Sequence, residues 1–216
     1  MPESVKIIYR GGTGEITEKK SRFIAHICPI ASEQEALDEI ARLKKEYWDA
    51  RHNCFAYLLG PDSRLQRYSD DGEPAGTAGR PMLEVLLNQG LHDCLAVVTR
   101  YFGGTLLGTG GLLRAYQGAV MEGLNHCETA VKSFGRLYTI RCDYNSIGKI
   151  QYLLGQEHIP VSDTRYTDAV ETDLLMTEED FRALIRKINE LTAGQAEVRK
   201  GPETPFLTVN GRTIPV

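Results

Sequence analysis

The stretch VVTRYFGGTLLGTGGLLRAY, residues 97–116, decides how the chain is organised. The apolar run LAVV at residues 95–98 predicts a buried strand. The strand is followed by a cluster of glycines, which are Gly103, Gly104, Gly108, Gly110 and Gly111. Thr109 is predicted to cap a helix whose apolar face includes Leu112 and Tyr116. Because backbone N–H groups and the positive end of a helix dipole converge after such a loop, we predict an anion-binding site there.

Two arginines flank this glycine loop. Arg100 precedes it and Arg114 follows it, and both guanidinium groups are suited to phosphate or carboxylate. The loop nevertheless matches neither of the common nucleotide motifs. Thr109 stands where a P-loop has lysine, and Leu113 stands where a dinucleotide fingerprint has its third glycine. The alternative hypothesis is a glycine loop that only packs closely against a neighbouring strand.

A second unusual stretch is SDDGEPAGTAGRP at residues 69–81. Its prolines and glycines exclude a helix or a central strand. Its three carboxylates, on Asp70, Asp71 and Glu73, are of the kind that binds Mg²⁺ or Ca²⁺. No EF-hand pattern, histidine or cysteine accompanies them, so we predict no metal, and a tight Asp-Gly turn is the alternative. We expect this loop and the glycine loop to form one site, with Glu73 or Asp71 within reach of Arg100.

The candidate ligand-binding residues are those polar and glycine positions of the two loops that a bound anion would contact. They are Asp70, Asp71, Glu73, Thr77, Arg100, Gly103, Gly104, Gly108, Thr109, Gly110, Gly111 and Arg114. No cofactor and no catalytic residue is assigned, because no nucleophile and base can be paired. His52 lies near Cys54 in the sequence, but a cysteine on an apolar strand is better explained as a core residue.

Charge and cysteine content restrict the class of protein. Lys and Arg total 25 against 29 Asp and Glu, a formal charge of −4, so nucleic-acid binding would need a local basic patch. The cysteines are widely spaced and form no CxxC pair, which predicts free thiols without zinc. They are Cys28, Cys54, Cys94, Cys127 and Cys142. We expect a cytoplasmic protein without a membrane segment, because no apolar run approaches the length of a membrane span.

Hydrophobic periodicity divides the chain into two domains and predicts the α+β class. Residues 1–132 are predicted to form an N-terminal domain in which Ser32 caps a helix, Glu35 completes the capping box, and Trp48 closes the core. Residues 132–135 are the predicted boundary. Residues 136–201 show the order β-α-β-β-α-β, which is the ferredoxin-like split βαβ plan. Residues 202–216 contain three prolines and are predicted to be an extended tail, with disorder as the alternative.

The sheet of the second domain is another candidate surface for RNA. Tyr138, Tyr144 and Tyr166 would stack on bases, with Arg141 and Arg165 beside them. The alternative, which we favour, is that these tyrosines are packing residues, because no RNP-like aromatic motif is present. We therefore assign the main ligand to the first domain and a modulating or partner contact to the second.

Four long motifs make the chain similar to a known family. They are KSRFIA at 20–25, RHNCFAY at 51–57, SDDGEPAGTAGRPMLEVL at 69–86 and the glycine-loop stretch at 97–116. In these motifs the chain resembles the Impact family, in its bacterial YigZ-type two-domain form. The resemblance implies an N-terminal α/β sandwich like the second domain of a small-subunit ribosomal protein. It also implies a C-terminal domain similar to the last domain of elongation factor G.

Both of these implied likenesses favour RNA or the ribosome as a partner, although a shared fold does not establish function. Eukaryotic relatives regulate translation by competing for an activator of a starvation-sensing kinase. They carry a different N-terminal module, so that partnership is not transferred. We predict a binding or regulatory protein linked to translation that recognises RNA, a ribosome-associated component or another anionic partner, such as a protein. The alternative is an enzyme acting on a phosphorylated or anionic small molecule, with the acidic loop and Arg100 at its site.

Overall fold

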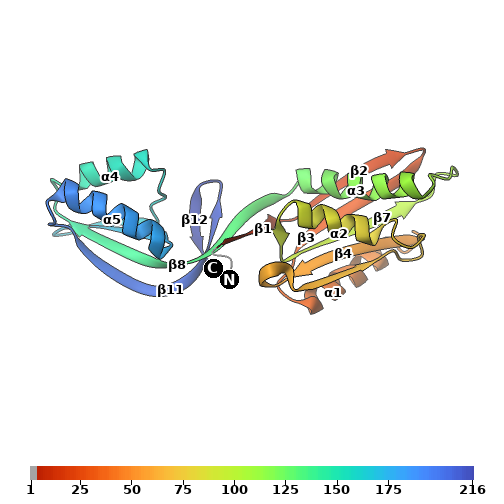
Figure 1. Cartoon of the computed structure of the whole chain (residues 1–216), viewed down its shortest axis with the longest axis horizontal. Coiled ribbons are helices and arrows are strands. Elements are labelled where there is room, and N and C mark those ends of the chain that lie inside the picture. The colour runs from red at the N-terminus through yellow and green to blue at the C-terminus, as the bar shows by residue number, and fades with distance from the viewer. Residues whose placement is uncertain (1–3) are drawn as a thin grey trace. The chain divides into compact units, whose positions relative to one another are not determined.

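The structure is a computed structural model that describes residues 4–216, and it divides into two compact units (Figure 1). The first unit runs to Thr129 and the second runs from Ala130 to Val216. Residues 132–135, the predicted boundary, lie inside the long strand β8 (Glu128–Cys142). Ser133 and Gly135 are buried and Phe134 is exposed, as in a strand whose side chains point alternately to its two faces. The two units divide slightly earlier along the same strand, between Thr129 and Ala130.

The first unit is built on a five-stranded antiparallel sheet with the order β2-β3-β7-β4-β5. Its strands are β2 (Gly12–Glu18), β3 (Ser21–Pro29), β4 (His52–Leu59), β5 (Leu65–Ser69) and β7 (Cys94–Tyr101). β1 (Ser4–Arg10) pairs in parallel with the short β6 (Leu91–His92), and these two strands belong to a second sheet, in which β1 lies next to β8. A single 3-10 turn, η1 (Pro61–Ser63), joins β4 to β5. The predicted buried strand at residues 95–98 is thus the central strand β7.

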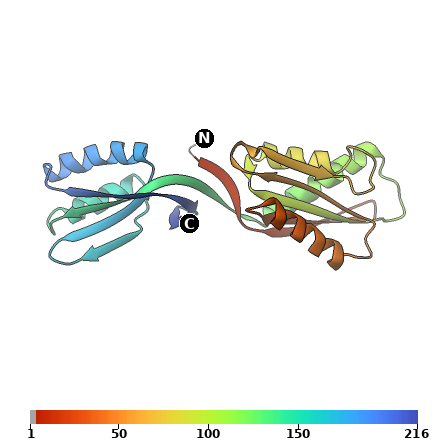
Figure 2. The same cartoon turned by 90° about the horizontal axis from the view of Figure 1, so that it is seen from below.

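Helices cover both faces of this sheet, which explains the continuous apolar run in β7. Figure 2 shows α1 (Glu33–Glu46) on the side of the sheet opposite α2 (Gly79–Asn88) and α3 (Thr109–Asn125). Ala96 and Val98 join the core beneath α2 and α3, whereas Leu95 and Val97 join the core beneath α1. The predicted α/β sandwich and the α+β class are confirmed.

The predictions made for the ends of the helices are only partly correct. The Ser32 hydroxyl accepts a hydrogen bond from the Glu35 N–H at 3.2 Å, as a capping residue should. Trp48 does not close the core: it is 82% exposed, because α1 ends at Glu46 and Trp48 lies in the connection to β4. Thr109 does not cap α3 either. It is the first helical residue, and Gly108 occupies the capping position with a φ of +73°.

The second unit has the predicted β-α-β-β-α-β order, followed by one more strand. Its sheet order is β9-β10-β8-β11-β12, and all neighbours are antiparallel. Both helices of the unit pack on one face of this sheet. Their apolar residues form one core with those of β8 and β10. The elements after β8 are α4 (Ile147–Gln156), β9 (Asp163–Tyr166), β10 (Val170–Met176), α5 (Glu178–Thr192), β11 (Glu197–Val209) and β12 (Arg212–Pro215).

The predicted tail at residues 202–216 is a pair of strands. β11 continues to Val209 and pairs with β8, and β12 returns beside β11 as a hairpin. Pro202 is tolerated because the β8–β11 register shifts between Lys200 and Glu203, where the ladder is interrupted. Phe206 is 5% exposed, so this segment contributes to the packing of the unit.

Two further findings concern the whole described chain. The five cysteines are all unpaired thiols. None of the helices within residues 4–216 is long and apolar enough to cross a membrane.

Candidate functional site

A cleft of about 390 Å³ lies in the first unit, at the end of β7. It is lined by Glu73 and Pro74 of the acidic loop and by residues 106–109 of the glycine loop. Arg100 at the end of β7 and His52 at the start of β4 also line it, and these two residues are directly opposite in the antiparallel register. The structure therefore brings together the two loops that were expected to form one site.

The floor of the cleft is a buried ion pair. Arg100 Nη1 donates to Glu73 Oε1 at 2.6 Å, which is the proximity expected from the sequence. Arg100 is 6% exposed and Glu73 is 9% exposed. The Tyr116 hydroxyl donates to the same carboxylate oxygen at 2.8 Å. A buried charge is tolerated when it is paired and hydrogen-bonded, so Glu73 is what keeps Arg100 in this position.

The Arg100 guanidinium retains donors that the protein does not use. Its Nε has no hydrogen-bond partner, and its Nη2 reaches the Ser21 hydroxyl only at 3.5 Å. Its central carbon lies 5.3 Å from the centre of the Phe23 ring and 5.6 Å from that of Phe102. An arginine has five N–H donors, and a buried donor without an acceptor is energetically unfavourable. The guanidinium, which lines the cleft, is therefore not fully satisfied by the protein's own acceptors.

The N-terminus of α3 opens at the same cleft, through Gly108 and Thr109. No side chain caps this helix, and its first turn contains no acidic residue. The first intrahelical bond is the one from Leu112 N–H to Gly108 O, so the N–H groups of residues 109–111 have no acceptor within the helix. By contrast, α1 and α5 are each capped by a side chain and carry acidic residues in the first turn. The start of α3 thus supplies positive potential that no side chain of its own first turn offsets.

The glycines of the loop serve different purposes. Gly103 packs against the backbone of the Lys20–Ser21 turn, where an added Cβ would lie 2.0 Å from the Lys20 carbonyl carbon. Gly104 and Gly108 have positive φ angles of +84° and +73°, which direct the chain into α3. Gly110 has open space around its Cβ position. Close packing, the alternative hypothesis, therefore explains Gly103, whereas the start of α3 is left open.

Most of the acidic loop is structural. The Asp70 carboxylate accepts the N–H groups of residues 76, 78 and 79 at 2.8–3.0 Å, which fixes the loop and the start of α2. Asp71 accepts from the Asn53 N–H at 2.7 Å and from Lys44 Nζ at 2.8 Å. The Thr77 hydroxyl donates to the Pro74 carbonyl at 2.7 Å. These three predicted ligand residues are thus engaged internally, and only Glu73 of the loop's candidates reaches the cleft.

The loop also contains the tight Asp-Gly turn that was the alternative prediction. Asp71 and Gly72 both have positive φ angles, and the Glu73 N–H donates across them to Asp70 O at 2.9 Å. Within residues 4–216, no group of His, Cys, Asp or Glu side chains is arranged to hold a metal ion. The Asp70 and Asp71 carboxylates instead accept hydrogen bonds from the backbone of the loop, of the start of α2 and of β4.

Four exposed cations lie on the elements that form the cleft or on the turn packed against the glycine loop. Arg51 lines it and is exposed, and Arg114 is exposed on α3. Lys19 and Lys20 belong to the turn against which Gly103 packs. Across the described residues, none of these four side chains has an ion-pair partner. Arg114 itself does not line the cleft, so its contribution is electrostatic and not a direct contact.

Several cleft residues were not predicted from the sequence. Arg51, His52, Phe102, Leu106 and Leu107 all line the cleft. The motif RHNCFAY marks the start of β4, but only the β4–β7 register places His52 beside Arg100. Sequence periodicity identifies two buried strands without giving the register between them.

Cys54 is a core residue, as predicted, and not part of a dyad with His52. It is fully buried, and its Sγ donates to the Asp70 carbonyl at 3.0 Å. Burial raises the pKa of the Cys54 thiol to about 12. The His52 Nδ1 is directed elsewhere, to the Asp71 carbonyl at 2.9 Å. A thiol that stays protonated at neutral pH is a poor nucleophile.

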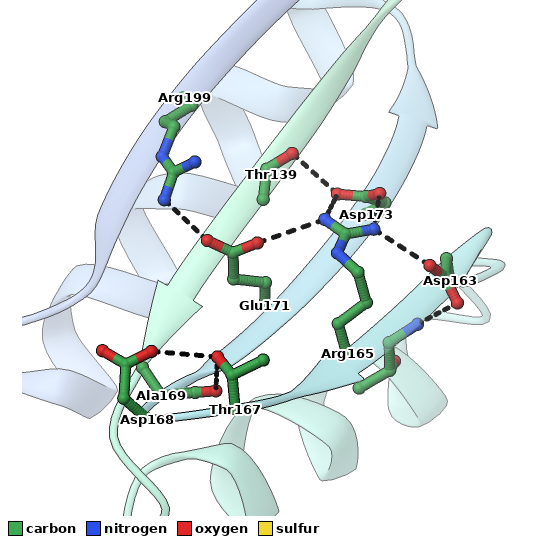
Figure 3. A network of polar contacts seen from close by, with 10 residues as sticks. Thr139, Asp163, Arg165, Thr167, Asp168, Ala169, Glu171, Asp173 and Arg199 are labelled. Carbon is green, nitrogen blue, oxygen red and sulfur yellow. Dashed lines mark hydrogen bonds and ion pairs between the residues drawn. The ribbon is translucent and has the colours of Figure 1, made fainter.

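The sheet face of the second unit is occupied by ion pairs (Figure 3). Arg165 donates to Asp163 at 2.9 Å, to Asp173 at 3.0 Å and to Glu171 at 3.3 Å. This contact with the Arg165 guanidinium lowers the pKa of the Asp173 carboxyl. Glu171 also accepts from Arg199 at 2.6 Å. The arginines of this face are thus neutralised by neighbouring carboxylates, which disfavours nucleic acid.

The tyrosines predicted on that face are divided between two environments. Tyr138 is fully buried and stacks on Phe181 with 3.6 Å between ring centres, so it belongs to the core. Tyr144 and Tyr166 are exposed, and their ring centres lie 6.4 Å apart. Tyr138 is therefore a packing residue, as we favoured from the sequence, because the alternation of β8 turns its side chain toward the helices.

Comparisons with known proteins agree with this architecture. Residues 19–124 match the Impact N-terminal domain, and residues 140–195 match a domain of unknown function, DUF1949. IMPACT family member YvyE of Bacillus subtilis is 42% identical over 204 residues, which is 94% of each chain. IMPACT family member YigZ of Escherichia coli is 45% identical over 140 residues, covering 64% of this chain and 69% of that protein.

A solved structure agrees over nearly the whole chain. The crystal structure of a hypothetical protein superposes with a TM-score of 0.60 and 36% identity, covering 92% of this chain and 97% of that one. Both domains, their order and almost the full length of a curated relative are therefore matched. On this evidence the chain belongs to the Impact family, as a two-domain member of the YigZ type.

Proposed function

We propose that this protein is a binding or regulatory protein linked to translation, and that it recognises an anionic partner through the Arg100 cleft. The partner is RNA or an anionic group of a protein. The observation that carries the proposal is the buried Arg100 guanidinium, whose Nε has no acceptor, in a cleft that also receives the uncapped start of α3. Both features favour the binding of a negatively charged group.

The contacts of the acidic loop favour binding over catalysis. The enzyme hypothesis needed Asp70 and Asp71 as a base or as metal ligands, and both carboxylates are occupied by backbone N–H groups. Glu73 is occupied by Arg100 and Tyr116. The carboxylates thus support the position of Arg100, which is the role expected in a site that holds an anion.

The link to translation rests on the family and on local charge. The resemblance of both domains to components of the translation machinery motivates the link. The chain carries a formal charge of −4, which opposes non-specific binding to nucleic acid. Arg51 lines the cleft without an ion-pair partner among the described residues, and this local positive charge supports a specific contact instead.

Cosedimentation with purified bacterial ribosomes tests this proposal. Thr109 lines the cleft at the start of α3, so Thr109→Asp places a fixed negative charge where the anion would lie. Thr109→Asn is the matched control, because it has nearly the same size without the charge. An acidic residue in the first turn also stabilises a helix, so both variants should fold. We expect the aspartate variant to bind ribosomes about tenfold more weakly than the asparagine variant.

Two results would contradict the proposal. One is that the wild-type chain does not pellet with ribosomes even at low salt. The other is that the two Thr109 variants pellet equally well. A salt titration then distinguishes the kind of contact, because contacts with RNA phosphates make log affinity fall linearly with log salt concentration.

A further inference from the structure

The cleft joins its charged floor to an apolar wall. The wall is formed by Pro74, Phe102, Leu106, Leu107 and Leu112. Leu106 is 82% exposed and Phe102 is 50% exposed, so both large apolar side chains face solvent. Large apolar side chains gathered beside a polar floor are typical of a surface that is covered by a partner. The ligand of this cleft should therefore present an apolar group next to its negative charge.

The charge balance of the floor favours a singly charged anion. The Arg100 charge is already matched by Glu73, whose carboxylate oxygen lies 2.6 Å from Nη1. The remaining positive potential comes from Arg51 and from the start of α3. Because Arg100 and Glu73 both line the cleft, an anion bound at the Arg100 guanidinium lies close to the Glu73 carboxylate and is repelled by it. This repulsion is greater for a terminal phosphate dianion than for a carboxylate.

The size of the cleft favours the end of a chain. Its volume of about 390 Å³ is that of a small-molecule site and not of an extended groove. Within a protein, a side-chain carboxylate and an apolar side chain lie on different residues. At the last residue of a chain, the main-chain carboxylate and the side chain are attached to the same Cα atom. A C-terminal apolar residue thus offers both required groups in the smallest space.

We propose, building on the function proposed above, that the cleft binds the C-terminal carboxylate of a partner protein whose last residue is apolar. The carboxylate accepts from the Arg100 guanidinium, which lines the cleft, and from the free N–H groups at the start of α3. The last side chain packs between Phe102 and Leu106, which cover it on the solvent side. Capture of a terminal carboxylate by convergent backbone N–H groups is an established mode of peptide recognition.

Fluorescence anisotropy with labelled peptides tests this inference on the full chain. The probe is a pool of pentapeptides with a fixed C-terminal leucine and four randomised positions, prepared as the free acid and as the amide. A second free-acid pool ends in serine. We expect the leucine free acid to bind about tenfold or more tightly than either the amide or the serine pool, because each lacks one of the two groups.

The Thr109 pair locates the peptide. Thr109→Asp should weaken binding of the leucine free acid about tenfold relative to Thr109→Asn. Binding of the amide should be equal for the two variants, because the amide has no charge to repel. Equal binding of acid and amide would overturn the inference.

Ribosome binding separates the inference from the function on which it rests. If ribosome binding depends on the charge at Thr109 but the peptide pools do not bind, the peptide inference is wrong and the proposed function stands. If a short single-stranded RNA competes for the cleft and the peptides do not, the partner is RNA and the inference is again overturned. If neither ribosomes nor peptides bind, both proposals fall.

Discussion

Arg100 is buried at the cleft because its surroundings compensate for its charge. Glu73 neutralises it at 2.6 Å, and the rings of Phe23 and Phe102 lie within cation–π distance of the guanidinium. The sequence predicted the ion pair from the cost of leaving an arginine unpaired beside a buried strand. It did not predict that Asp70 and Asp71 would be occupied by backbone N–H groups, because those bonds depend on the path of the folded loop.

The ion pair leads to a prediction about stability. Glu73→Ala leaves the Arg100 charge buried without a partner, so it should lower the free energy of unfolding by about 3–5 kcal/mol. Glu84→Ala is the matched control, since Glu84 is exposed and pairs only with Arg80 on the same helix. That change should cost at most about 0.5 kcal/mol. Urea unfolding followed by circular dichroism measures both, and equal losses would show that the buried pair does not anchor Arg100.

At the scale of elements, the sequence predicted the strands and helices well where the pattern is local. The Ser32 cap, the buried strand at residues 95–98 and the order β-α-β-β-α-β were all found. Two errors have a common cause. The segment at 132–135 and the tail after residue 201 contain polar residues, prolines and glycine, which are local signals for a break. Pairing between β8 and β11 overrides these signals, and a single sequence does not reveal such long-range pairing.

Gly135 tests this pairing directly. A Cβ added there would lie 2.3 Å from the Met176 carbonyl oxygen and 2.8 Å from a ring carbon of Phe206. Gly135→Ala should therefore destabilise the second unit by about 1–3 kcal/mol, because the backbone of β10 must shift. Gly148→Ala is the control, since nothing lies within 4 Å of its Cβ position in α4. It should be neutral or stabilising by about 0.5–1 kcal/mol. A harmless Gly135→Ala, measured by thermal unfolding, would mean that residues 132–135 are a loose linker.

At the scale of the molecule, two units with separate cores divide the charge unequally. The second unit neutralises its sheet arginines internally, whereas in the first unit Arg51 lines the cleft without an ion-pair partner among residues 4–216. We propose on this basis that the first unit holds the main ligand and that the second contacts or modulates a partner. The formal charge of the whole chain is −4, and this total does not indicate where positive charge gathers in the folded unit. The local positive charge arises because the turn at residue 20, the start of β4 and the glycine loop meet in the folded unit.

The central claim is that an anion binds between Arg100 and the start of α3. An NMR titration that follows the Arg100 Nε–H and the backbone amides of Gly110 and Gly111 tests it most directly. The ligands are a short single-stranded RNA and the free-acid peptide pool ending in leucine. We predict that at least one of them shifts these three resonances first, and that Thr109→Asp abolishes the shifts while Thr109→Asn retains them. The claim is contradicted if neither ligand moves these resonances, or if the shifts gather on another surface.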